Sequence, residues 1–252
     1  MPIHRIHGQL RNLNWKPALK DFRDKRYTPK PKLAPLPDHV DPLDAEIAIW
    51  DQGQLGSCTA HGTGSLWAHR MLKEGKGQVM PSRLFIYYCE RVIEDTVSDD
   101  NGALVRDGLK ALADSGVPPE SYWPYDIARF DEKPPQEAYD AALNDVALEY
   151  NAVDMNLDAI KHCLADGNPI TFGFTVFESI NNTGPDGMMP MPSDDERILG
   201  GHCVAFVGYD DAKQCFICRN SWGVNSGFKG RFYMPYSNLP NCSDGWVLTS
   251  VK

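Results

Sequence analysis

The sequence has neither a membrane-spanning run of apolar residues nor an excess of basic residues. Nowhere do its 252 residues approach the roughly 18 consecutive apolar positions of a spanning helix, so we expect no membrane insertion. The net charge of -9 and the lack of a Lys/Arg cluster argue against a nucleic-acid partner. Residues 1–15 lack the apolar core of a signal peptide, which predicts a cytoplasmic protein or one exported without a conventional signal.

The cysteines do not follow the pattern of a secreted disulfide protein either. There are seven, an odd number, and we expect a reduced, intracellular chain. Cys215 and Cys218 have the spacing of a metal or redox pair, but the run around them is strand-like, which places the two thiols on opposite faces. No second ligand pair follows at zinc-finger spacing. We therefore predict neither a metal nor a cofactor.

The stretch from Gln52 to Ala60 has the features of a tight loop followed by a helix. Gly53 and Gly56 allow an irregular backbone, and Ser57 is a good N-cap for a helix that begins at Cys58. A cysteine in a first turn lies at the positive end of the helix dipole, which favours the nucleophilic thiolate. From this stretch alone, a buried structural cysteine is an equal alternative.

Two later stretches contain the partners that a cysteine nucleophile needs. His202 begins an apolar, strand-like run, and Asn220 is followed by Ser221 and Trp222. The nucleophile requires a base, and the base requires a third group that fixes its tautomer. Cysteine first, with histidine and asparagine roughly 130–150 residues downstream, is the order in papain-type enzymes.

On these motifs the chain resembles the papain-like cysteine peptidases, from about residue 36 to about residue 234. The resemblance implies Cys58 as the nucleophile, His202 as its general base and Asn220 as the partner that orients the histidine. It also implies an oxyanion hole formed by the Gln52 side chain and the Cys58 backbone N–H. Trp222 would shield the Asn220–His202 hydrogen bond from water.

The same resemblance implies a set of substrate-binding residues in the cleft. The pocket for the second residue on the acyl side of the scissile bond should be roomy and apolar, accepting Leu, Phe or Tyr. Val105, Gly200 and Cys203 would line this pocket, Gly102 and Ala103 would bind the substrate backbone, and Gly201 and Trp222 complete the implied set.

Three departures from the family pattern lie close to these motifs. Leu55 stands where secreted relatives carry a disulfide-forming cysteine, Thr59 replaces an aromatic residue, and Ser226 replaces a second tryptophan. None of them changes the catalytic trio. They indicate a divergent branch of microbial or viral type that lacks the usual disulfide next to the nucleophile.

Periodicity predicts helices in the first half of the chain and strands in the second, which indicates an α+β protein with two lobes. The family resemblance implies a papain-like peptidase domain over 38–252, with the active site in the cleft between its lobes. One lobe would be helical, about 58–150, and the other β-barrel-like, about 151–252. We expect helices over 58–72, 81–96, 104–115, 135–148 and 157–165, and strands over 169–177, 202–209, 214–219, 230–234 and 246–251.

Residues 1–37 form an N-terminal extension that resembles a propeptide in position. Its prolines forbid long helices, yet it carries large apolar groups such as Trp15, Phe22 and Tyr27. We expect it to dock over the cleft as an intramolecular inhibitor. A disordered linker or a brace on the back of one lobe are the alternatives.

The sequence therefore predicts a cysteine endopeptidase that hydrolyses peptide or protein substrates through a thioester. A transferase, ligase or exopeptidase with the same Cys-His-Asn machinery is an alternative. A non-catalytic binding protein that kept the fold is the alternative from another class.

Overall fold

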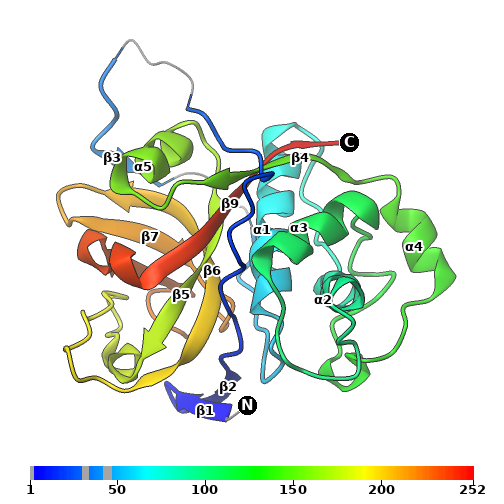
Figure 1. Ribbon diagram of the computed structural model, residues 1–252, viewed down its shortest axis with the longest axis horizontal. Coiled ribbons are helices and arrows are strands. Elements are labelled where there is room, and N and C mark those ends of the chain that lie inside the picture. Colours follow the sequence, from blue (N-terminus) through cyan, green and yellow to red (C-terminus); the bar gives the residue numbers. More distant parts are fainter. Residues whose placement is uncertain (1–2, 30–33, 42–46) are drawn as a thin grey trace.

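A lobe of helices and a lobe of strands lie side by side (Figure 1). The computed structural model describes residues 3–29, 34–41 and 47–252. Among these residues, no helix is both long and apolar enough to span a membrane. The described chain contains all seven cysteines, each of them a buried free thiol.

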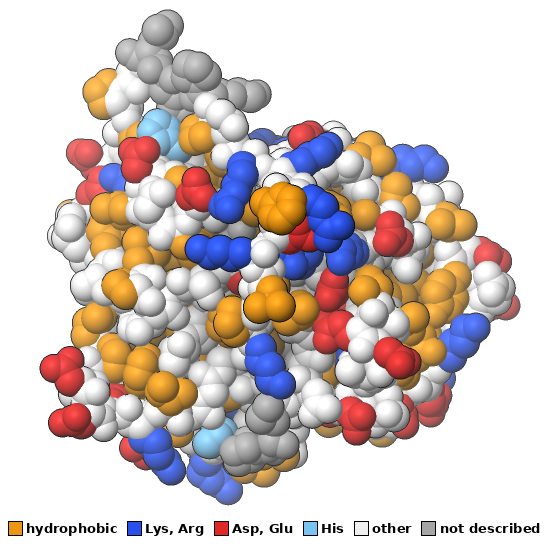
Figure 2. Space-filling model, viewed as in Figure 1, with side chains coloured by type: hydrophobic (Ala, Val, Ile, Leu, Met, Phe, Trp, Pro, Cys, Tyr) orange, Lys and Arg blue, Asp and Glu red, His pale blue; other side chains and the backbone are white. Residues whose placement is uncertain are grey.

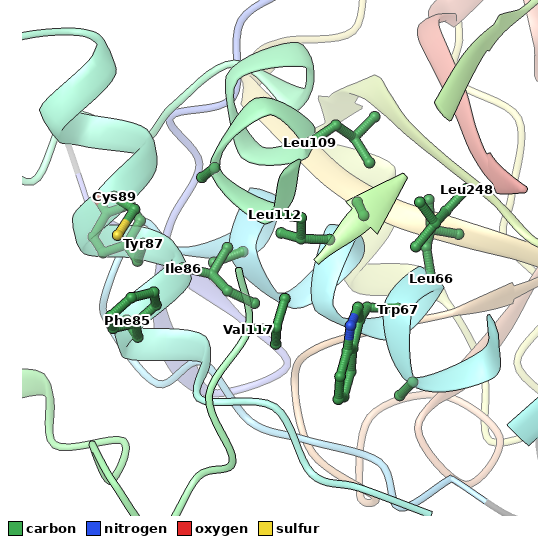
Figure 3. Packing of buried hydrophobic residues seen from close by; sticks show 14 of the residues in the cluster. Leu66, Trp67, Phe85, Ile86, Tyr87, Cys89, Leu109, Leu112, Val117 and Leu248 are labelled. Atoms are coloured by element: carbon green, nitrogen blue, oxygen red, sulfur yellow. The ribbon is translucent and has the colours of Figure 1, made fainter. Parts of the chain in front are cut away.

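The helical lobe is built on α1, which crosses the middle of the molecule (Figure 1). Leu66 and Trp67 of α1 pack against buried residues of α2 and α3, and Leu248 adds a contact from the last strand (Figure 3). Ser82 caps α2 by accepting a hydrogen bond from the Phe85 N–H at 3.2 Å. The helices are α1 (Cys58–Lys73), α2 (Arg83–Ile93), α3 (Val105–Asp114) and α4 (Gln136–Ala142).

The second lobe is an antiparallel sheet in the order β4-β9-β5-β6-β7-β8, with β3 paired to β6. Within the described residues, no pairing joins β8 to β4, so the sheet does not close into a barrel. Helix α5 (Leu157–Ala165) packs against β5 and β6. The strands are β3 (His39–Val40), β4 (Ala147–Val153), β5 (Ile170–Phe177), β6 (Ile198–Asp210), β7 (Cys215–Arg219), β8 (Arg231–Pro235) and β9 (Cys242–Val251).

The predicted helices and strands are present, and four strands were missed, namely the short β3, the long β4 and two strands at the start of the chain. The helix expected over 135–148 ends at Ala142, and the chain from Ala147 pairs with β9 instead. The predicted boundary between the lobes, at 150/151, therefore falls inside β4. Three short 3₁₀ helices complete the described chain, at Ile127–Arg129, Glu178–Asn182 and Tyr236–Asn241.

A short hairpin lies at the start of the chain. Strand β1 (Ile3–Ile6) pairs with β2 (Gln9–Asn12) across a two-residue turn. Both turn residues, His7 and Gly8, have positive φ, which is the geometry of a type I′ hairpin. From this hairpin the chain runs up between the two lobes (Figure 1).

Gly62 allows α1 to lie directly against the sheet. A Cβ atom at this position would lie 2.4 Å from Thr171 Oγ1 and 3.0 Å from Cys203 Sγ. A glycine inside a helix often marks such a close approach of another element. Gly64 on the same helix is less confined, since its nearest neighbour would be the tip of Ile86 at 3.3 Å.

We predict opposite outcomes for alanine at these two glycines. Alanine favours a helix by up to about 1 kcal/mol over glycine, but overpacking costs typically about 1–3 kcal/mol. Gly62→Ala should therefore lower the free energy of unfolding, whereas the matched control Gly64→Ala should leave it unchanged or raise it. Urea unfolding of both variants checks this, and equal effects would contradict the packing argument.

Candidate active site

The first residue of α1 meets the middle of β6 between the lobes. Cys58 begins the helix, and the backbone N–H of Cys203 in β6 lies close enough to its thiol to oppose the rise of its pKa. His202, the residue before Cys203, therefore lies beside the same helix terminus. The side chains of Cys58 and His202 are both fully buried.

The hydrogen bonds of His202 fix which ring nitrogen carries the proton. Asn220 Oδ1 accepts from the Ser221 N–H at 2.8 Å, which identifies it as the amide oxygen. His202 Nε2 lies 2.8 Å from this same oxygen and must be the protonated nitrogen. Nδ1 is buried with no hydrogen-bond partner among the described residues. The neutral ring is thus held with Nδ1 available as a base.

Trp222 packs over His202, whose bond to Asn220 the resemblance implied it would shield. Its ring stacks on His202 with centroids 4.5 Å apart and planes inclined by 21°. Trp222 is itself 3% exposed. Water is excluded from that face of the imidazole.

Three hydrogen bonds hold the backbone N–H and the side chain of Gln52. Its backbone N–H donates to the Ser221 carbonyl at 2.9 Å, and its side-chain oxygen accepts from the Ser221 hydroxyl at 2.6 Å. Its amide nitrogen donates one hydrogen to the Leu55 carbonyl at 2.9 Å. The second amide hydrogen is left for another acceptor.

Two expectations about the start of α1 are wrong for this conformation. Ser57 occupies the N-cap position but makes no side-chain cap, because its hydroxyl lies 2.5 Å from the Tyr125 hydroxyl. Burial raises the pKa of the Cys58 thiol to about 12 and lowers the pKa of His202 to about 4. Desolvation outweighs the helix dipole here, so both groups are neutral at pH 7.

Residues 9–15, which we call the covering segment, pass directly over this site. The Trp15 N–H donates to the Gly201 carbonyl at 3.2 Å, and the Gly201 N–H donates to the Leu13 carbonyl at 3.1 Å. Leu13 and Trp15 are buried. The segment thus pairs with the residue that precedes His202.

Four glycines make room for the covering segment. Three of them were predicted as substrate-binding residues, while Gly173 was missed; a lone glycine inside a strand was its sequence signal. A Cβ atom would lie 2.9 Å from the Asn14 carbonyl oxygen at Gly102, 1.8 Å from the Trp15 indole at Gly173, 2.4 Å from the Leu13 carbonyl oxygen at Gly200 and 2.2 Å from the Trp15 carbonyl oxygen at Gly201.

The other predicted substrate-binding residues line the same region. Trp15 belongs to one core cluster with Val105 and Cys203, the residues assigned to the acyl-side pocket. Ala103, 5% exposed, follows the Gly102 contact. The structure therefore brings the predicted set together, with the covering segment lying on it.

Asp100 is a site residue that the sequence analysis missed. Its carboxylate accepts hydrogen bonds from the Gly56 N–H at 2.9 Å, the Tyr87 hydroxyl at 2.5 Å and Asn12 Nδ2 at 2.9 Å. It joins the nucleophile loop, the helical lobe and the covering segment without a covalent bond. An acidic loop gives no local signal of this role.

Known proteins resemble this chain over most of its length. The family described as papain family cysteine protease matches residues 36–244. A protein of Acanthamoeba polyphaga mimivirus described as an uncharacterized peptidase C1-like protein is 40% identical over 223 residues, covering 83% of this chain and 72% of its own.

Solved structures agree with the sequence match. The crystal structure of xylellain, a cysteine protease from Xylella fastidiosa, is 36% identical with a TM-score of 0.90, covering 100% of this chain and 99% of its own. Digestive procathepsin L 3 of Tenebrio molitor, at 16% identity and a TM-score of 0.70, covers 90% of this chain and 75% of its own and shares the fold. The chain belongs to the papain family of cysteine proteases.

Proposed function

We propose that this cysteine peptidase is an endopeptidase and that its covering segment holds it inactive until displaced. The observation that supports both parts is the burial of Cys58 and His202, with an oriented imidazole, beneath residues 9–15. No observation on the described residues favours a transferase, a ligase, an exopeptidase or a non-catalytic binding protein.

In the proposed mechanism, His202 Nδ1 takes the proton of the Cys58 thiol, and the thiolate attacks the scissile carbonyl. The second amide hydrogen of Gln52 and the Cys58 backbone N–H stabilise the developing oxyanion. The imidazolium then protonates the leaving amine, and water hydrolyses the thioester with His202 again as the base. Asn220 keeps the ring in the required tautomer throughout.

The covering segment occupies the groups that a substrate would use. Trp15 fills the space beside Gly173, Val105 and Cys203, and the backbone of Leu13 and Trp15 uses both hydrogen-bonding groups of Gly201. A peptide substrate needs the same wall and the same backbone groups. Binding of the two is therefore mutually exclusive.

The chain after the covering segment is attached to both lobes. Arg106 donates to Asp24 at 2.7 Å, and the Tyr27 N–H donates to the Ala152 carbonyl at 2.8 Å. Basic and acidic side chains gather near the middle of the face in Figure 2, where this part of the chain crosses between the lobes. The expected docking of Phe22 is wrong, since that side chain is 98% exposed.

We predict that Gln52→Ala lowers kcat by about 10²–10³, the usual cost of one oxyanion-hole donor. Gln54→Ala, two residues away and exposed, is the matched control and should retain full activity. Cleavage of an internally quenched peptide checks this. Thermal unfolding must show that Gln52→Ala is folded, and equal kcat values for both variants would remove Gln52 from the mechanism.

We predict that Trp15→Ala in the full-length chain raises kcat/KM for peptide substrates. Burial of such a side chain contributes roughly 1.5–3 kcal/mol. Its loss should therefore increase the fraction of molecules whose covering segment has left the cleft by about tenfold or more. Phe22→Ala is the control, because this exposed aromatic contributes no burial. If Trp15→Ala is stable and no more active than the parent, the segment only braces the lobes.

We predict that acid favours displacement of the covering segment. The covered His202 has a pKa of about 4, below the ordinary value of about 6.5, so exposure of the ring is coupled to proton uptake. Neutral His202 stabilises the covered state above about pH 6.5, and this contribution is lost as the pH falls towards 4.

The measurement is the iodoacetamide labelling rate of Cys58 in the full-length chain, divided by the rate in Trp15→Ala. This ratio should rise between pH 7 and pH 4.5. A ratio that stays constant or falls, with both proteins folded by circular dichroism, contradicts the coupling.

A further inference from the structure

The side chain of Arg11 in the covering segment is seated in a pocket formed by the enzyme body. Its side chain is 3% exposed, although arginine is rarely buried. Arg11 Nη1 donates to Asp51 Oδ1 at 2.5 Å and to the Gly53 carbonyl at 3.0 Å. Arg11 Nη2 donates to the Trp222 carbonyl at 3.0 Å and to Gln9 Oε1. The guanidinium carbon lies 5.8 Å from the centre of the Trp222 ring.

The pocket is held in place without Arg11. Asp51 Oδ1 also accepts from the Gly53 N–H at 2.8 Å, which fixes the carboxylate. Asp51 forms an isolated antiparallel bridge with Trp222, which fixes the Trp222 carbonyl. Once the covering segment leaves, one carboxylate and two carbonyl oxygens point to a common position that contains no cation. A guanidinium fits such a set better than any other side chain, because it offers several donors in one plane.

The position of this pocket relative to the nucleophile follows from the course of the covering segment. Leu13 and Trp15 lie against Gly200 and Gly201, on the side assigned to the acyl part of the substrate. Arg11 precedes Trp15 by four residues, about 13 Å of extended chain. It lies at Asp51, next to Gln52, and at Trp222, which stacks on His202. The catalytic pair is between the two ends, so the pocket lies on the leaving-group side.

We propose that Asp51, with the carbonyl oxygens of Gly53 and Trp222, is a subsite for an arginine side chain on the leaving side of the scissile bond. This inference rests on the proposed endopeptidase function. Arg11 occupies the subsite in the covered chain as a substitute for the substrate's arginine. Asp51 is the specificity-determining residue, because it supplies the only full charge among these acceptors. Its carboxylate is 45% exposed, which gives an arginine access and moderates the energy gained.

The test uses the full-length chain carrying Arg11→Ala and Trp15→Ala, in which the subsite is vacant and the segment is weakened. Arg11→Ala alone serves if the double variant does not fold. Internally quenched peptides share a leucine as the second acyl-side residue and carry arginine or citrulline at the first, second or third leaving-side position. Citrulline keeps the shape of arginine without its charge. We expect kcat/KM to favour arginine by about tenfold at one of the three positions, and Asp51→Asn to reduce that ratio to about one.

Asp51→Asn is a conservative change, since the Asn oxygen can still accept from the Gly53 N–H. Equal cleavage of arginine and citrulline peptides at all three positions would overturn the inference and leave Asp51 as an anchor for the covering segment only. A ratio that Asp51→Asn does not change would also overturn it.

A binding measurement distinguishes failure of the arginine subsite from failure of the proposed endopeptidase function. The same peptides, labelled with a fluorophore, are titrated into the chain with Cys58→Ala added, and anisotropy gives Kd. Tighter binding of the arginine peptide that depends on Asp51 supports the subsite even if the active chain cleaves no peptide, in which case the endopeptidase proposal fails alone. Equal Kd values beside normal cleavage overturn the subsite alone.

Discussion

The site depends on the contact between the start of α1 and the middle of β6. Cys58 belongs to the helical lobe and His202 to the sheet, so their separation is set by how closely the two lobes pack. Gly62, one turn into α1, permits that packing, because any side chain there would meet Thr171 and Cys203. A catalytic pair whose two members come from different lobes requires such a rigid contact, since small displacements of the reacting groups lower the rate by large factors.

Non-covalent contacts hold the nucleophile loop in the absence of a disulfide at Leu55. Asp100 binds the Gly56 N–H and the Tyr87 hydroxyl, and Arg91 donates from α2 to the carbonyls of Val97 and Phe130. Arg91 is itself fully buried. Buried charges kept in place by several hydrogen bonds are costly to disturb. The nucleophile loop and the loops around Val97 and Phe130 are therefore fixed to the same helix, α2.

The motifs near Gln52, Cys58, His202 and Asn220 could be predicted because each is a short run whose residue types suit one chemistry. Packing between distant segments could not be predicted in this way. Nothing local distinguishes Trp15, which finds a space beside Gly173, from Phe22, which is exposed. The helix expected over 135–148 failed for the same reason, because pairing with β9 decides the conformation from Ala147 onwards.

The charge state of the site also required the tertiary structure. The helix dipole favours a Cys58 thiolate, and that term is visible in the sequence. The desolvation that opposes it comes from the burial of Cys58 and His202 in the folded chain, over which the covering segment lies. In the proposed inhibited state, the segment would act on the chemistry in two ways, by occupying the substrate's position and by contributing to the burial that keeps both groups neutral.

The cost of ordering the covering segment and of burying the catalytic pair limits how tightly the segment can bind to the cleft. Ordering each backbone residue costs about 1–2 kcal/mol, while burial of Trp15 contributes roughly 1.5–3 kcal/mol. Few residues of the segment therefore make a net favourable contribution to the free energy of its binding. Covering must also desolvate His202, and this cost grows as the pH falls below about 6.5, where the exposed ring takes up a proton. The balance therefore rests on a small number of anchors, chiefly Trp15 against Gly173 and Arg11 against Asp51. Because both anchors occupy positions proposed for substrate side chains, a substrate that fills them competes with the segment at the contacts where it is strongest.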